Sequence, residues 1–98
     1  AAVALARRGD PAAQGTLREM LSPAALEKVI DLPSATERRS KIEAIELEAL
    51  LALQASVAAG KPDLAKSLRA EVEAETKSGL VGVRNNAQAL LKSLQSNP

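Results

Sequence analysis

The chain is predicted to be all-α, with about five to six helices arranged as stacked helical hairpins. The strongest sign is the stretch from Ala35 to Gly60, which has no Pro or Gly before its last residue and is rich in Ala, Leu and Glu. Such a composition favours a long helix. No segment alternates polar and apolar residues with period two, so no sheet is expected. An irregular helical bundle is the alternative architecture.

The length and composition fit one domain. The 98 residues include no Cys, His, Trp, Tyr or Phe, so the core must be built from Ala, Leu, Ile, Val and one Met. Small side chains bury less apolar area per residue, and we expect modest stability. Residues 1–98 are treated as a single domain. Because the chain starts abruptly with uncapped helix-forming residues, we expect it to come from a larger protein.

Breaks at Gly, Pro and Ser divide the chain into helical segments. The expected helices are 1–8, 11–21, 23–31, 35–60, 62–78 and 80–95. Asp10 and Ser22 each precede a Pro and are expected to cap the following helix through a side-chain oxygen. Ser34 or Thr36 is expected to cap the long helix. Gly9 and Gly60 suit the left-handed position that ends a helix.

The long helix carries two apolar stripes. The first consists of Ile42, Ile45, Ala49, Leu50, Leu53 and Val57, and the second, roughly opposite, of Leu47 and Leu51. A helix with two such stripes is expected to pack between neighbours on both sides. We therefore predict that the second half of this helix is enclosed and that its charged first half is exposed.

Two segments of the chain resemble each other. Residues 9–21 (GDPAAQGTLREML) and 60–72 (GKPDLAKSLRAEV) share Gly, Pro, Leu and Arg at one offset. Self-similarity over tens of residues is typical of stacked helical hairpins.

The junction 4–21 (ALARRGDPAAQGTLREML) and the segment 83–94 (VRNNAQALLKSL) resemble the short HEAT-type, armadillo-like repeats of bacterial proteins. The resemblance implies an α-solenoid fragment that presents a groove to a protein partner or to neighbouring repeats, and it makes self-association plausible. The chain departs from the family pattern in three places. It lacks the acidic residue and Pro before Val83-Arg84, it inserts a short helix in 22–34, and its long helix exceeds a standard unit.

Several chemistries are excluded by residue type. Without His or Cys, a Ser–His nucleophile and His- or Cys-based zinc sites cannot form. The acidic candidates form two sets: Glu43, Glu46 and Glu48, and Glu71, Glu73 and Glu75. Residues two apart on a helix point in different directions, so both sets are expected to be solvated helix faces. We predict no catalytic, cofactor-binding or metal-binding residue.

Arg38 and Arg39 are the candidate partner-binding residues. They lie near a helix start, where the helix dipole disfavours cations, so they need a partner such as Glu43 or an acidic surface outside the chain. The net charge of +1 and the lack of aromatic residues make nucleic acid an improbable partner. No apolar run reaches the ~18–20 residues that a membrane span requires.

These observations predict a non-enzymatic interaction or scaffold module of a larger protein. One alternative is an accessory helical domain of a bacterial enzyme whose catalytic part lies outside this chain. A second alternative is a nucleic-acid-binding helical repeat.

Overall fold

The computed structural model describes residues 2–96, and in this range the chain is all-α with no strand. The all-α prediction is confirmed; the parts of it that concern residues 1, 97 and 98 lie outside the described residues. The elements are α1 (Ala2–Arg7), the 3₁₀ turn η1 (Pro11–Ala13), α2 (Gln14–Met20), α3 (Pro23–Val29), α4 (Ala35–Ala58), α5 (Asp63–Ser67), α6 (Arg69–Glu75) and α7 (Val81–Ser96).

The helix expected over 62–78 is divided at Leu68, which raises the α-helices above the expected number to seven within 2–96. The backbone of Leu68 leaves the helical region, with φ −106° and ψ 16°. The Ser67 hydroxyl donates to the Leu64 carbonyl oxygen at 2.6 Å, and the Leu68 amide bonds instead to Ala65. A side chain that competes for a backbone carbonyl in this way bends a helix.

The predicted caps are present. Asp10 accepts a hydrogen bond from the Ala12 amide at 2.9 Å, and Ser22 accepts one from the Ala25 amide at 3.3 Å. Of the two candidates for α4, Ser34 is the cap, and it accepts from the Glu37 amide at 3.3 Å. These bonds fix where η1, α3 and α4 begin.

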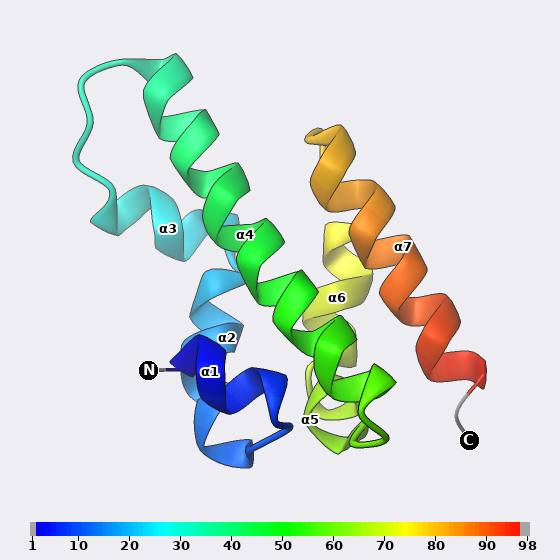
Figure 1. Ribbon diagram of the computed structural model, residues 1–98. Coiled ribbons are helices and arrows are strands. Elements are labelled where there is room, and N and C mark those ends of the chain that lie inside the picture. The colour runs from blue at the N-terminus through cyan, green and yellow to red at the C-terminus, as the bar shows by residue number, and fades with distance from the viewer. Residues whose placement is uncertain (1, 97–98) are drawn as a thin grey trace.

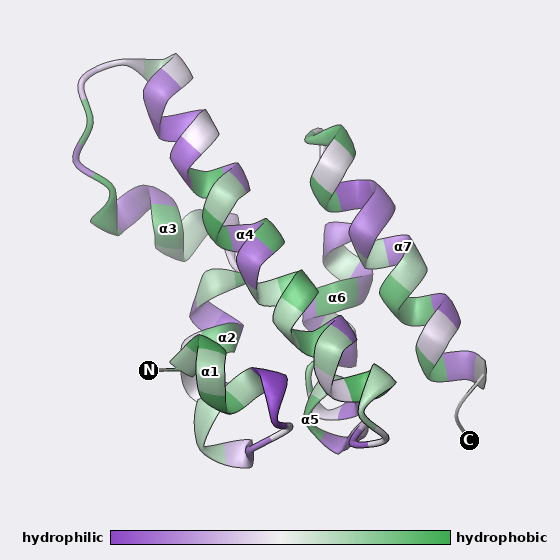
Figure 2. Cartoon of the chain, viewed as in Figure 1, coloured by the Kyte–Doolittle hydropathy of each residue, from purple (hydrophilic) through white to green (hydrophobic). Residues whose placement is uncertain are grey.

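Helix α4 forms the axis of the molecule (Figure 1). Its second half packs against α1 on one side and against α7 on the other, and α7 runs alongside it in the same direction. The first half of α4 extends beyond α1 and α2 toward the loop that joins it to α3. Figure 2 shows that this first half is mainly polar, whereas the second half is mainly apolar.

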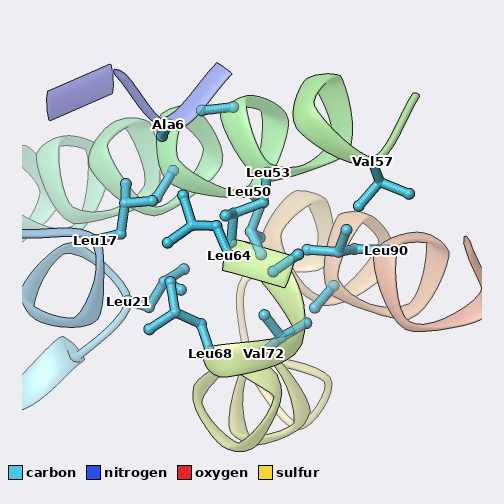
Figure 3. Close-up of a cluster of buried hydrophobic side chains, with 14 of the residues drawn as sticks. Ala6, Leu17, Leu21, Leu50, Leu53, Val57, Leu64, Leu68, Val72 and Leu90 are labelled. Carbon is cyan, nitrogen blue, oxygen red and sulfur yellow. The ribbon is translucent and has the colours of Figure 1, made fainter. Parts of the chain in front are cut away.

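One apolar cluster joins α1, α2, α4, α5, α6 and α7 (Figure 3). Its large buried members include Leu17, Leu21, Leu50, Leu53, Leu64, Leu68, Val72, Val83, Leu90 and Leu94. Leu26 of α3 and Ile42 of α4 are also buried, but they lie outside this cluster. Helix α3 and the first half of α4 therefore form an arm with a separate, smaller apolar contact surface.

Helix α4 is flanked on two sides as predicted, but the second apolar stripe is not enclosed at Leu51. Leu51 is 53% exposed, and Ala55 and Ala58 on the same face are also exposed. The flanking helices leave this face of α4 to solvent. Leu47, the other member of the second stripe, is half-buried and lies near α7, where a Cβ built on Gly82 would be 3.7 Å from Leu47 Cδ1.

The two Gly-x-Pro turns have the same backbone geometry. Gly9 and Gly60 have φ of 73° and 81°. Their amides bond to Ala6 and Val57, and the next amides bond to Leu5 and Ser56, which is the Schellman pattern. The turns also touch, because a Cβ on Gly9 would be 2.8 Å from Lys61 Cβ. The shared geometry is limited to these two turns. The assignment of the chain to HEAT-type repeats stays a prediction.

Candidate functional site

A groove of about 620 Å³ lies between α3, α4 and the connection from α6 to α7. We call it the arm groove. Its lining consists of Pro23, Glu27, Ala35, Arg38, Arg39, Ile42, Glu46, Ala74, Glu75, Lys77, Ser78, Gly79 and Leu80. The volume is in the range of pockets that hold small ligands or inserted side chains.

Both residues of the predicted arginine pair line the arm groove, but they differ in their contacts. The Arg38 guanidinium donates to the Leu32 carbonyl oxygen at 2.6 Å, so its partner is the loop before α4 and not Glu43. Arg39 is exposed and has no hydrogen bond or ion pair within residues 2–96. The expected Arg39–Glu43 pair is therefore not formed. Lys77, which sequence reasoning did not select, adds a third cation from the turn after α6.

Two carboxyl groups meet within the lining of the arm groove. Glu46 of α4 and Glu75 of α6 are 1% and 2% exposed, so the prediction that both acidic sets are solvated faces is wrong for these two residues. Each set contributes one member to a pair formed between helices. The prediction compared spacings within one helix and did not consider contacts across two.

A sequence signal for this burial did exist. Glu46 lies four residues from both Ile42 and Leu50, inside the apolar stripe of α4. Glu75 lies three residues after Val72, where the stripe of Leu64, Leu68 and Val72 continues. The position of an acidic residue within an apolar stripe of a helix predicts that its side chain is buried, although its charge alone would predict exposure.

The environment of the pair favours protonation. Burial raises the pKa of Glu75 from its ordinary value of 4.5 to about 8, aided by its hydrogen bond to Glu46 and by the charge of Glu46. Burial also raises the pKa of Glu46, the hydrogen bond from Glu75 opposes this rise, and the charge of Glu43 adds to it. The direction of these shifts favours a neutral Glu75 carboxyl group at neutral pH.

Three oxygens of this pair have no other donor. They are Glu46 Oε1, Glu46 Oε2 and Glu75 Oε1, each with almost no exposed surface. A buried acceptor without a donor costs free energy unless something supplies one. No group of three or more acidic side chains able to hold a metal ion occurs within residues 2–96. The pair therefore leaves hydrogen-bond acceptors without donors in the lining of the arm groove.

The rest of the described chain offers few other candidates. The ion pairs lie on the surface: Arg18–Glu71 at 3.0 Å joins α2 to α6, and Arg69–Glu73 at 3.1 Å lies within α6. Such exposed pairs contribute little to stability. None of the helices within 2–96 has the length and apolar character to cross a membrane.

No protein-family model, curated protein or solved structure matches the chain. The arm groove is therefore interpreted from its own residues.

Proposed function

We propose that this chain is a non-enzymatic interaction module of a larger protein and that the arm groove binds an acidic segment of a protein partner. The observation that carries the proposal is the set of basic side chains in the lining of the arm groove, which we call the basic rim. This rim consists of three cations that line one groove: Arg38 and Arg39 of α4, and Lys77 in the turn after α6. Arg39 in particular forms no ion pair within residues 2–96.

Charge complementarity explains why the partner would be acidic. Carboxylates of a partner would supply the ion pair that Arg39 lacks and would relieve the unfavourable position of a cation near the start of α4. The apolar side chains of Ile42 and Leu80 in the same groove would contribute buried area.

The lining favours binding over nucleophilic catalysis. It contains carboxyl groups but no imidazole or thiol, and its one hydroxyl belongs to Ser78, which accepts a hydrogen bond from the Leu80 amide. The related proposal that the chain is built from HEAT-like hairpins, a type of unit that presents grooves to proteins, rests on the resemblance of residues 4–21 and 83–94.

A fluorescent peptide with four glutamates around one lysine tests the proposal. We expect measurable binding by fluorescence anisotropy at low salt, and at least a tenfold loss of affinity in the double variant Arg39→Glu, Lys77→Glu. The matched control is the double variant Arg7→Glu, Arg8→Glu, which changes the net charge by the same amount. Its two residues lie on α1 and in the turn after it, outside the groove. Equal affinity of the two double variants, or tighter binding of a single-stranded DNA of equal charge, would contradict the proposal.

A further inference from the structure

The buried carboxyl groups of Glu46 and Glu75, which we call the floor of the arm groove, are a polar feature that the fold does not explain. Glu46 and Glu75 occupy positions in two apolar stripes where Leu or Met would pack without an unmet hydrogen bond. Replacing a buried charged pair with apolar residues is often neutral or stabilising in proteins. A role in binding accounts for two carboxyl groups at this place.

The buried carboxyl oxygens of the floor favour a ligand group that donates hydrogen bonds and carries a positive charge. The three oxygens without other donors, Glu46 Oε1, Glu46 Oε2 and Glu75 Oε1, accept hydrogen bonds but cannot donate when ionised. A primary ammonium group has three N–H donors and one positive charge. Apolar side chains of Ile42 and Leu80 line the same groove and would contact a methylene stem.

We propose that Glu46 and Glu75 bind the ammonium group of one lysine side chain carried by the acidic partner segment. This inference rests on the proposed function and names the residue that the groove selects. The rim would hold the acidic neighbours of that lysine, and the floor would hold its Nζ. The carboxyl oxygens are shielded from solvent, so this binding requires both side chains to turn toward the groove.

Binding of the ammonium group would release the proton that Glu75 holds at neutral pH. The lysine stays protonated, its N–H groups take the place of that proton, and the proton leaves to solvent. The charged groups around the pair are Glu27 of α3, Arg38, Arg39 and Glu43 of α4, and Lys77 after α6. Helix α7 contributes no charged side chain to the described lining. Affinity should therefore rise with pH between about 6 and 8.

The test compares the lysine peptide with the same peptide acetylated at Nζ, which keeps the glutamates and removes the ammonium charge. We expect acetylation to lower the affinity of the wild-type protein at least tenfold at pH 8. We also expect the affinity for the unmodified peptide to rise severalfold from pH 6 to 8, with no such rise for the acetylated peptide. This comparison needs no variant of the protein.

Variants then locate the effect. Glu75→Gln should bind both peptides equally, and Glu46→Gln provides the same test should Glu75→Gln not fold by circular dichroism. Glu48→Gln, on an exposed position of α4 outside the groove, should behave as wild type. Discrimination between the peptides that persists in both floor variants would overturn the inference.

The outcomes separate the two proposals. The wild type could bind both peptides equally, with binding lost in the double variant Arg39→Glu, Lys77→Glu. This result would overturn the ammonium site but would still support the groove for an acidic segment. Absence of binding by both peptides would overturn both proposals.

Discussion

At the scale of single residues, Glu46 and Glu75 determine how this protein should respond to pH. The pKa of Glu75 rises from 4.5 to about 8 on folding, mainly because its carboxyl group is removed from water. The folded chain therefore holds a proton that the unfolded chain releases between these two pH values. The stability from this proton is fully present below pH 4.5 and is lost as the pH rises toward and through 8.

We expect the free energy of unfolding to fall between pH 5 and 8, by at most about 1.4 kcal/mol per pH unit for this one group. Glu75→Gln keeps the shape and the donor of the protonated side chain, so it should flatten this dependence and raise the melting temperature at pH 8. Thermal unfolding followed by far-UV circular dichroism measures both effects. Glu48→Gln is the control, and a slope in Glu75→Gln as steep as in wild type would contradict the assignment.

Two leucines of α4 give a second comparison at this scale. Leu53 is fully buried in the main cluster, whereas Leu51 is 53% exposed. Leu53→Asp places a carboxylate in an apolar site and should cost on the order of 3–5 kcal/mol, enough to unfold a domain of modest stability. Leu51→Asp should change stability by less than about 1 kcal/mol. Similar melting temperatures for the two variants would contradict the burial described here.

At the scale of elements, the local chemistry of the chain predicted most of the helix boundaries. Asp10, Ser22 and Ser34 cap helices because a side-chain oxygen reaches an amide two or three residues ahead, which is visible in sequence. The break at Leu68 coincides with a bond from the Ser67 hydroxyl to the Leu64 carbonyl oxygen, and hydrophobic spacing does not reveal it.

Tertiary contacts determine what sequence reasoning missed. The exposure of Leu51 depends on which faces of α4 the neighbouring helices cover. The carboxyl pair depends on α4 and α6 meeting at one point, although its two stripe positions were visible separately. Arg38 and Arg39 were identified because a cation near a helix start is unfavourable, and Lys77 was missed because its relation to the groove comes only from the fold.

The two turns should differ in their tolerance of a side chain. Ala in the left-handed conformation costs roughly 1–2 kcal/mol at either glycine. Gly60 has open space around it, but a Cβ on Gly9 would meet Lys61 Cβ at 2.8 Å and the Lys61 carbonyl oxygen at 3.3 Å. Gly9→Ala should therefore destabilise more than Gly60→Ala in urea unfolding. The reverse order would show that the turns do not touch as described.

At the scale of the whole molecule, stability is unevenly distributed. The main apolar cluster joins six of the helices within residues 2–96 and excludes α3, which has Leu26 as its buried side chain. The arm of α3 and the first half of α4 therefore has fewer buried contacts than the rest.

Hydrogen exchange should reveal this difference. We expect amides of α3 to exchange at least tenfold faster than those of the second half of α4, because the arm can open without disrupting the main cluster. Exchange measured by NMR spectroscopy resolves the two regions, and α7 serves as an internal reference for the core. Equal protection of α3 and the second half of α4 would show that the arm and the core unfold together.

The position of α3 outside the main cluster affects the thermodynamics of binding. Pro23 and Glu27 of α3 line the arm groove, so one wall of the binding site belongs to the less anchored part of the molecule. An occupant that fixes this wall reduces the conformational entropy of the protein, and this loss opposes association. We therefore expect calorimetry to find a favourable enthalpy partly offset by an unfavourable entropy.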